Sequence, residues 1–246
     1  MLKITTLYDN YIHSAIPGLR GGWGFSCLVE YDDKVILFDA GADGRILLSN
    51  AERLRVDLER VQVLVLSHDH GDHTGGLAEF LSVNRQALVY LGESFSAELK
   101  DFVAGHAAGL REVGRAVGIV PRIFTTGELG SGLKEQSLVL DFDHRLALIT
   151  GCAHPGIAEI ARFAASEFGS GVYLVMGGFH LGGMPGERVR RIAEELKAQG
   201  VQKAAPSHCT GDDALSIFRE VFGDGFITAG VGTVIELGEH DSPASA

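Results

Sequence analysis

Three histidines and two aspartates lie within six consecutive residues of this chain, inside the segment 67–76, which reads SHDHGDHTGG. A neutral imidazole offers one nitrogen lone pair to a cation and a carboxylate offers oxygen, so both are common metal ligands. Without a cation, groups packed this densely would repel one another or be costly to bury. The segment therefore predicts a binding site for a divalent metal ion, in preference to a polar surface loop.

The elements around this segment would direct its side chains toward two neighbouring metal positions. Residues 61–66 form a short apolar run, VQVLVL, that predicts a buried strand. Alternate side chains of an extended chain face the same way, so His68 and His70 would point together from the carboxyl end of that strand. A glycine then allows a sharp turn, after which Asp72 and His73 would begin a helix. One pair of ligands thus follows the strand, and the other begins the helix.

Three further histidines follow apolar, strand-like runs later in the chain: His154, His180 and His208. Ligands in α/β proteins gather at the carboxyl ends of strands, so all three could converge on the first segment. Taken singly, a histidine is more often a structural residue than a ligand. Because the 67–76 segment already predicts a metal site, we favour His154 and His208 as further ligands. For His180, a structural role and a ligand role both stay open.

The composition is typical of a globular protein with one sizeable core. The chain has 246 residues, of which 46% are hydrophobic and 22% charged. This predicts a single domain over residues 1–240 and a frayed, flexible tail over 241–246. The formal net charge of −11 argues against nucleic acid as a partner, because phosphate binding needs a basic surface.

The cysteine count and the hydropathy pattern predict a cytoplasmic protein without a membrane anchor. Cys27, Cys152 and Cys209 are odd in number and widely spaced, so no disulfide framework is expected. The amino terminus lacks the pattern of a signal peptide. We found no apolar run of the roughly 18 residues that a membrane helix needs.

The expected elements follow a similar order in the two halves of the chain. In the first half we predict strands at 2–8, 26–31, 34–38, 61–66, 87–90 and 122–126, and helices at 45–58, 72–81 and, broken by glycines, 96–117. In the second half we predict strands at 137–142, 145–149, 172–176, from 203, 226–228 and 234–237, and helices at 156–168, 187–199 and 212–222. The shared order suggests two sheets packed face to face with helices outside, an α/β architecture.

The motifs resemble those of the metallo-β-lactamase superfamily over nearly the whole chain. The resemblance is carried by the His68-x-His70-x-Asp72-His73 motif, by His154 in TGCAH and by His208, with weaker support from an aspartate in FDAG at 38–41. The segments GFSCLVE at 24–30, GGFHL at 177–181 and SHCTG at 207–211 resemble the subgroup related to dihydropterin ribofuranosylaminobenzene phosphate synthase.

The resemblance implies an αββα sandwich of two mixed sheets, with the metal centre at one edge. It also implies two ligand sets. One metal would be held by His68, His70 and His154, and the other by Asp72, His73 and His208.

One departure from the family pattern concerns the carboxylate that most members with two metals place between the last two histidines. No aspartate lies between His154 and His208, and the glutamates there fall in expected helices. The strand-end position holds Phe179 and His180 instead, and a neutral imidazole has a single lone pair and cannot bridge two metals. His180 would then bind one metal or a bound water or substrate. We expect between one and two metal ions per chain, the second being removed first by mild chelation.

Three residues near the motifs allow two interpretations each. Asp39 would hold the second N–H of a ligand histidine, or it would cap a turn at a hairpin end. Cys152 and Cys209 adjoin predicted ligands, but neighbouring side chains of a strand point in opposite directions. We interpret both cysteines as small core residues, with thiolate ligation of a soft metal as the alternative.

The connection over residues 8–25 is long and rich in aromatic residues and glycine, and such connections often bind ligands. It resembles the loop that overhangs the site in this family, and we assign Asp9, Asn10 and Trp23 to substrate binding. The alternative is a packed surface loop. Three arginines could bind an anionic substrate: Arg188, Arg190 and Arg191. The favoured interpretation is that they form a solvated face of a helix.

These observations together predict a metal-dependent hydrolase that uses a metal-bound hydroxide. The metal would be Zn²⁺, as one or two ions, with iron or manganese as alternatives. Asp72 would accept a proton and His180 would stabilise the developing oxyanion. The expected partner is a small anionic ester, phosphodiester or lactone, and a homodimer is compatible with the sequence. The alternatives are a pterin-precursor synthase, an iron-dependent redox enzyme and a non-catalytic sensor of the same fold.

Overall fold

Two sheets packed face to face form the centre of the protein. In the computed structural model, which describes residues 1–238, the strands of the first sheet are β1 (Leu2–Tyr8), β2 (Ser26–Tyr31), β3 (Lys34–Phe38), β4 (Val63–Val65), β5 (Leu88–Gly92), β6 (Gly109–Val113) and β13 (Val234–Leu237). Those of the second are β7 (Val117–Val120), β8 (Ile123–Thr125), β9 (Leu138–Phe142), β10 (Arg145–Thr150), β11 (Val172–Gly178) and β12 (Lys203–Ser207). The strand orders are β13-β1-β2-β3-β4-β5-β6 and β12-β11-β10-β9-β8-β7.

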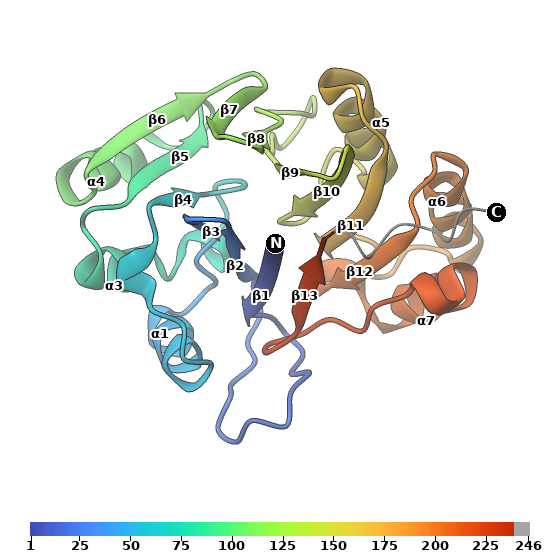
Figure 1. Cartoon of the computed structure of the whole chain (residues 1–246), viewed down its shortest axis with the longest axis horizontal. Helices are drawn as coiled ribbons and strands as arrows, with labels where there is room; N and C mark the ends of the chain where they lie inside the picture. Colours follow the sequence, from blue (N-terminus) through green and yellow to red (C-terminus); the bar gives the residue numbers. More distant parts are fainter. Residues whose placement is uncertain (239–246) are drawn as a thin grey trace.

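Helices cover the outer face of each sheet (Figure 1). They are α1 (Gly44–Arg53), α2 (Gly71–Thr74), α3 (Leu77–Val83), α4 (Ala97–His106), α5 (Ile157–Phe168), α6 (Gly186–Ala198) and α7 (Asp212–Phe222). Helices α1, α3 and α4 lie outside the first sheet, and α5, α6 and α7 lie outside the second. The predicted αββα sandwich of two mixed sheets is therefore confirmed.

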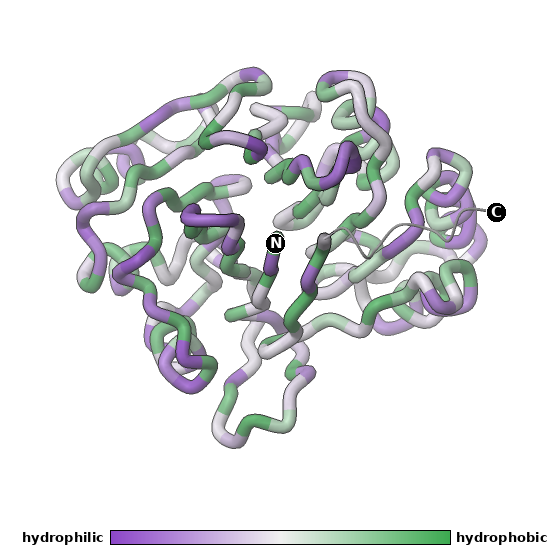
Figure 2. The backbone as a smooth tube through the Cα atoms, in the orientation of Figure 1, coloured by the Kyte–Doolittle hydropathy of each residue, from purple (hydrophilic) through white to green (hydrophobic). Residues whose placement is uncertain are grey.

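Both faces of the inner strands are buried, which explains why they appear in the sequence as nearly continuous apolar runs. In β2, Cys27 and Val29 face the opposite sheet, whereas Leu28 between them faces the helices. In β10, Ile149 faces the opposite sheet and Leu148 faces the helices. This alternation produces one apolar layer between the sheets and one beneath each set of helices. Figure 2 shows hydrophobic stretches in the central strands and many hydrophilic positions in the helices.

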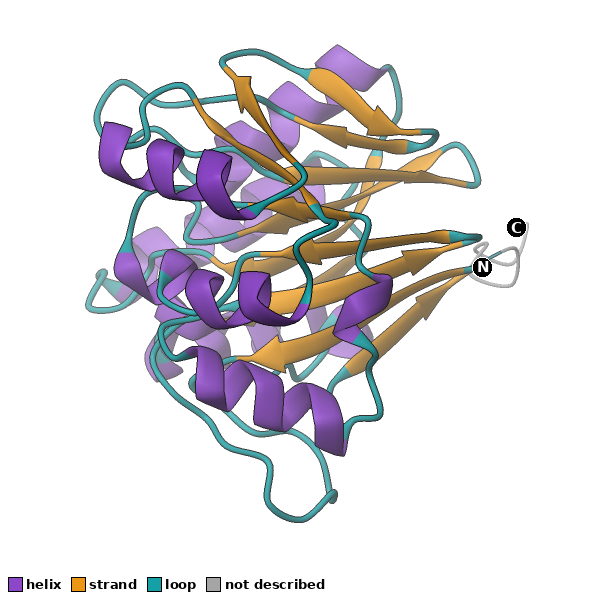
Figure 3. Ribbon diagram, turned by 90° about the vertical axis from the view of Figure 1, so that its left-hand side faces the viewer, coloured by secondary structure: helices purple, strands orange, loops and turns teal. Residues whose placement is uncertain are grey.

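Parallel pairing brings the carboxyl ends of several strands to one edge of the sandwich. In the first sheet β4 lies parallel to β3 and to β5, and in the second β11 lies parallel to β10 and to β12. The hairpin turn after β2 lies at the opposite end, where the amino group of Met1 lies 3.7 Å from Asp32 Oδ1. Figure 3 shows the strands running side by side, with the N-terminus at that opposite end. The segments that follow β4, β10, β11 and β12 therefore share one edge.

The predicted broken helix over 96–117 is wrong in its second part. Helix α4 ends at His106, and residues 109–113 form β6, which pairs with the edge of β5. Leu110, Arg111 and Glu112 are good helix formers, but pairing with the open edge of β5 satisfies their backbone groups and outweighs that preference. The first predicted helix is also shorter than expected, because α1 ends at Arg53 and a short 3₁₀ turn follows at Leu58–Arg60.

Two further expectations concern the end of the chain. Residues 226–228 form no strand of either sheet within the described range, and Phe226 makes an isolated bridge to Ala204. The predicted boundary at residue 240 and the tail over 241–246 lie outside the described residues. Within residues 1–238, none of the helices combines the length and the apolar character that crossing a membrane requires.

Asn50 of α1 fixes both ends of the long connection that follows β1. Its side chain is fully buried, and Nδ2 donates to the carbonyl oxygens of Leu7 and Arg20, each at 2.8 Å. Its Oδ1 accepts the backbone N–H of Arg20 at 2.9 Å. One side chain thus satisfies three backbone groups at the base of the connection.

We predict that Asn50→Ala lowers the free energy of unfolding by about 2–3 kcal/mol, because it leaves buried backbone groups without partners. Urea unfolding followed by circular dichroism measures this change. Ser49→Ala, one residue earlier in the same helix, is the matched control and should change stability by less than about 0.5 kcal/mol. Equal effects of the two substitutions would contradict the anchoring role.

Candidate metal centre

Three histidines from two sheets meet at the shared edge, and we call them the three-histidine group. His68 and His70 follow β4, and His154 follows β10. Their ligand nitrogens all lie within 4.8 Å of one another, and His68 Nε2 lies 3.1 Å from His70 Nδ1. His68 is buried, His154 is half-buried and His70 is exposed. Three imidazoles with one open side could hold a metal ion and leave a position free for a substrate or water.

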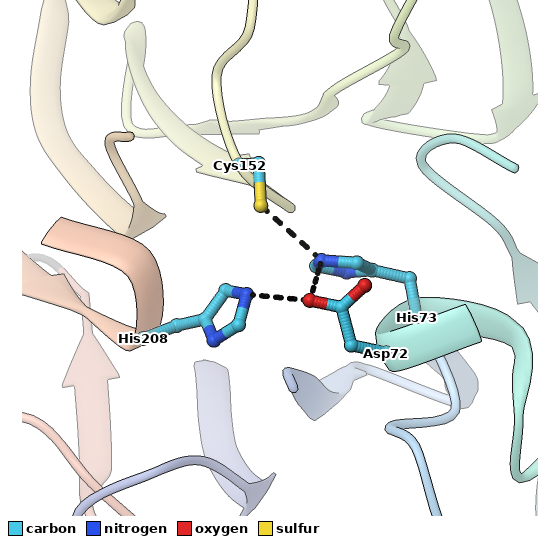
Figure 4. A group of neighbouring side chains, drawn as sticks. All are labelled: Asp72, His73, Cys152 and His208. Atoms are coloured by element: carbon cyan, nitrogen blue, oxygen red, sulfur yellow. Dashed lines mark hydrogen bonds and ion pairs between the residues drawn. The ribbon is translucent and has the colours of Figure 1, made fainter. Parts of the chain in front are cut away.

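A second set of ligands lies next to the first, and we call it the four-donor group. It consists of Asp72 and His73 from α2, Cys152 after β10 and His208 after β12 (Figure 4). Asp72 Oδ2 lies 3.3 Å from His208 Nε2 and 3.6 Å from His73 Nε2, and Cys152 Sγ lies 3.3 Å from His73 Nε2. The rings of His68 and His73 are 4.3 Å apart between centroids, so the two groups adjoin.

One atom of the four-donor group is placed where it could ligate a cation. His208 is 1% exposed, and its Nε2 makes no hydrogen bond within the described part of the chain, although Asp72 lies nearby. A buried polar atom without a partner is costly, and metal ligation would remove that cost. The donor chemistry also fits, since imidazole, carboxylate and thiol together suit zinc or iron.

Burial gives the two inner imidazoles the protonation state that metal binding needs. Burial lowers the pKa of His68 and of His73 to about 3, with a further contribution from the neighbouring imidazoles. Both rings are therefore neutral near pH 7 and keep a lone pair for a cation. Burial would raise the pKa of Asp72, but His208 and His73 hold it well below its usual range, so this carboxylate stays ionised.

Asp39 connects the two groups from behind. It is fully buried at the end of β3, and its Oδ2 lies 2.7 Å from His73 Nδ1. Its oxygens also accept the backbone N–H of Ser67 at 2.7 Å and the Ser67 hydroxyl at 2.8 Å, and that hydroxyl lies 2.9 Å from His68 Nδ1. Asp39 therefore lies where it could hold the second N–H of a ligand histidine and fix its tautomer. Burial raises the pKa of Asp39 to about 8, so a nearby cation would help to keep it ionised.

Glu135 orients His154 in a similar way, and the sequence analysis missed it. Its buried carboxylate accepts the backbone N–H groups of residues 151–154 at 2.9–3.0 Å and lies 2.8 Å from His154 Nδ1. Burial would raise the pKa of Glu135, but these hydrogen bonds lower it to about 2. Glu135 lies before β9, 19 residues before His154 and outside every motif of the sequence, so no motif spacing indicated its role.

The cysteines do not point away from the centre as the sequence analysis expected. Cys152 Sγ belongs to the four-donor group, and Cys209 Sγ lies 3.2 Å from it. The alternation of an extended strand fails because Ala153 has a left-handed backbone, with φ of 56°. The Cys209 hydrogen bond and burial raise the pKa of the Cys152 thiol, so its ionisation would need a bound cation.

His180 lies beside the two groups and belongs to neither. Its ring centroid is 4.6 Å from that of His154, and its side chain is exposed. A ligand nitrogen of His180 lies within 4.8 Å of the Cys152 and Cys209 sulfurs, and the backbone N–H of His180 donates to Cys209 Sγ at 3.3 Å. It therefore lies beside His154 and forms a third set of possible ligands with the two cysteines.

The connection after β1 overhangs the four-donor group. Asn10 Oδ1 lies 3.0 Å from His208 Nδ1, and Asn10 Nδ2 donates to the His208 carbonyl at 3.1 Å. Trp23 is 61% exposed, and its ring centroid lies 4.9 Å from that of His208. Asp9 is fully buried and accepts the N–H of Tyr11 at 3.0 Å. Asp9 thus shapes the loop from inside, in contrast to the substrate contact assigned to it from the sequence.

Residues with left-handed backbones gather at this edge. Asp39, Ala153, His180 and His208 have φ between 49° and 56°, and each follows a strand that ends here. Such a conformation costs a residue other than glycine on the order of 1 kcal/mol or more, and it persists where the surrounding structure enforces it. Its concentration at the metal-ligand groups supports a functional role for this edge.

Comparisons with known proteins agree with this geometry. Residues 20–163, more than half of the chain, match the family model of the metallo-beta-lactamase superfamily. A relative from Methanocaldococcus jannaschii, 7,8-dihydropterin-6-methyl-4-(beta-D-ribofuranosyl)-aminobenzene-5'-phosphate synthase, is 28% identical, and the match covers 96% of this chain and 97% of that enzyme. The uncharacterized protein MJ0448 of the same organism is 29% identical, with 96% of this chain and 100% of that protein covered.

A solved structure supports the same assignment. Tm1679, a metal-dependent hydrolase of the beta-lactamase superfamily, is similar with a TM-score of 0.81 and 27% sequence identity. The match covers 97% of this chain and 100% of that one. The likeness therefore extends over both sheets and the edge at which the metal-ligand groups meet.

We predict that Glu135→Gln weakens metal binding at the three-histidine group by about 10–100-fold, the usual effect of losing a partner behind a ligand. The Glu135 carboxylate has two acceptor oxygens, whereas a glutamine amide has one oxygen and one NH₂ group. The NH₂ group would face N–H donors of residues 151–154 and could not accept their hydrogen bonds. Competitive titration against a chromogenic chelator measures the affinity. Glu128→Gln is the matched control, because the Glu128 side chain is also buried, at 3% exposed, and also accepts a backbone N–H, that of Ser94. It contacts none of the proposed metal-binding residues. Unchanged affinity in Glu135→Gln would contradict the orienting role.

Proposed function

This chain belongs to the metallo-β-lactamase superfamily, and we propose that it acts as a metal-dependent hydrolase on a small anionic ester, phosphodiester or lactone. The observation that carries the proposal is the buried His208 Nε2, which has no hydrogen-bond partner within the described residues and faces the other donors. Asp72, His73 and Cys152 bring an oxygen, a nitrogen and a sulfur within 4.8 Å of that nitrogen, which supports a metal site there. The likeness to the metal-dependent hydrolase Tm1679 supports the same reaction class.

The two groups of donors would hold one or two divalent ions, with zinc as the proposed metal and iron or manganese as alternatives. When bound, such ions acidify a water molecule and polarise the bond that is to be cleaved. The three-histidine group has an exposed member, so the proposed substrate reaches that side first. The expectation that the second ion is removed first by mild chelation stays a prediction, although Cys152 adds a donor at that position.

Two side chains are proposed to act on the substrate and the attacking water. Asp72 is half-buried and ionised, and it would accept a proton or hydrogen bond from the water. Burial and the nearby His154 lower the pKa of His180, so a neutral His180 would donate an N–H to the oxygen on which negative charge develops. Asn10 and Trp23 would limit the substrate on the side of His208.

A second candidate function is the joining of two substrates by a pterin-related synthase. The observation that favours it is the 28% identity with the M. jannaschii synthase over 96% of this chain. Mass spectrometry of the products separates the two candidates, because hydrolysis adds the mass of water to the substrate fragments, whereas joining yields a larger product. An iron-dependent redox enzyme would instead show a coloured, oxidisable metal centre in its absorption spectrum.

We predict that His70→Ala abolishes metal loading of the three-histidine group and lowers kcat/KM by more than about 100-fold, since even residues behind a ligand contribute 10–100-fold. Elemental analysis and turnover of phosphodiester, lactone and thioester substrates measure the two effects. His106→Ala removes an exposed histidine that stacks on Phe102, far from the site, and should leave both unchanged. Full activity in metal-free protein would refute the proposal.

We predict that Cys152→Ser removes thiolate ligation at the four-donor group. With cobalt in place of the native metal, the wild-type protein should show a sulfur-to-metal charge-transfer band in the near ultraviolet, and Cys152→Ser should lose both the band and one bound ion per chain. Cys27→Ser is the matched control, because Cys27 is buried between the sheets and lies in none of the candidate ligand groups of the described residues. A band that persists in Cys152→Ser would show that Cys152 is not a ligand.

A further inference from the structure

A cavity of about 400 Å³ opens beside the three-histidine group, with His154 and His180 among its lining residues. Its walls come from the first turn of α5, the segment 179–184 after β11 and one side of α6. Most of the lining is apolar: Ile157, Phe179, Leu181, Met184 and Ile192. The volume lies within the range of roughly 300–1,000 Å³ that is usual for small-molecule sites.

The charges around this cavity leave one cation without a partner. Among the lining residues, Glu159 and Glu195 are both bonded to Arg162, with Arg162 Nη1 at 2.6 Å from Glu159 Oε2. Arg188 is the only cationic lining residue, and its exposed side chain forms no ion pair or hydrogen bond among residues 1–238. The two carboxylates are therefore already compensated, whereas the guanidinium of Arg188 is available to a ligand.

The neighbouring arginines of α6 differ from Arg188. Arg190 is bonded to Glu220 of α7, and Arg191 is exposed and does not line the cavity. Arg188 and Arg191 are exposed, in keeping with the interpretation as a solvated helix face, whereas Arg190 is half-buried. Arg188 lines the same cavity as His154 and His180.

We infer that this cavity binds the non-reacting part of the substrate, an apolar aryl or alkyl body that carries a carboxylate or phosphate group paired with Arg188. The inference rests on the proposed function, because it takes the three-histidine group as the reacting centre. The apolar body would lie between α5 and α6, where Met184 can adapt to its shape. A guanidinium pairs with either anion through two parallel hydrogen bonds, so Arg188 determines specificity for the charge of the substrate.

The test measures binding of small probes to the zinc-loaded full chain. Binding is monitored by NMR through the chemical shifts of methyl groups that line the cavity. The probes are phenyl phosphate and benzoate, which carry the two anionic groups, and benzyl alcohol, which is neutral. Arg188→Gln should weaken binding of phenyl phosphate, benzoate or both by about five- to tenfold, the effect of losing one partly exposed charged hydrogen bond. It should leave benzyl alcohol unchanged. Arg191→Gln, on the same helix, is the matched control and should change none of the three.

The outcomes separate this inference from the proposed function. Weakening confined to one anionic probe identifies the group that Arg188 recognises and supports the inference. Equal affinities in Arg188→Gln and Arg191→Gln for both anions, or the absence of probe-induced shifts at Met184 and Ile192, would overturn it. Because binding is measured without turnover and at equal zinc content, a protein that binds the probes through Arg188 but hydrolyses nothing would refute the hydrolase alone.

Discussion

The hydrogen bonds of two buried carboxylates determine where the metal-ligand groups lie. Asp39 holds His73 and, through Ser67, His68, whereas Glu135 holds His154 together with the backbone that precedes it. Each carboxylate is fully buried and surrounded by donors, so neither can move without leaving several groups unpaired. The imidazoles of His68, His73 and His154 are consequently oriented by the protein itself, before any cation binds.

The fold could be predicted from the sequence because the apolar runs and the family motifs indicate the same arrangement. The apolar runs predicted the hairpin strands 26–31 and 34–38 at the bounds that the structure shows. The resemblance then supplied the arrangement of two sheets and the two ligand sets. The strand 109–113 was missed because its residues favour a helix locally, and only the open edge of β5 makes a strand the better choice.

The site was less accessible to sequence reasoning where it depends on contacts between distant segments. Glu135 has no motif of its own, and its role arises from five donors that lie 16–19 residues away. The position of Cys152 depends on the left-handed backbone of Ala153. Alanine does not favour that conformation, so the sequence does not predict it. Asp9 belongs to the predicted loop but faces inward, because burial is decided by packing that the sequence alone does not reveal.

The donors come from both halves of the sandwich, with His68, His70, Asp72 and His73 from the first and Cys152, His154 and His208 from the second. An ion held by either group would therefore act as a reversible cross-link between residues that are distant in the chain. Such a cross-link favours the folded state by the binding free energy of the ion and opposes separation of the two layers. Loss of the ion would lower the stability of the folded state and open the contact between the two layers to proteases more often, so metal supply would influence how long the protein persists.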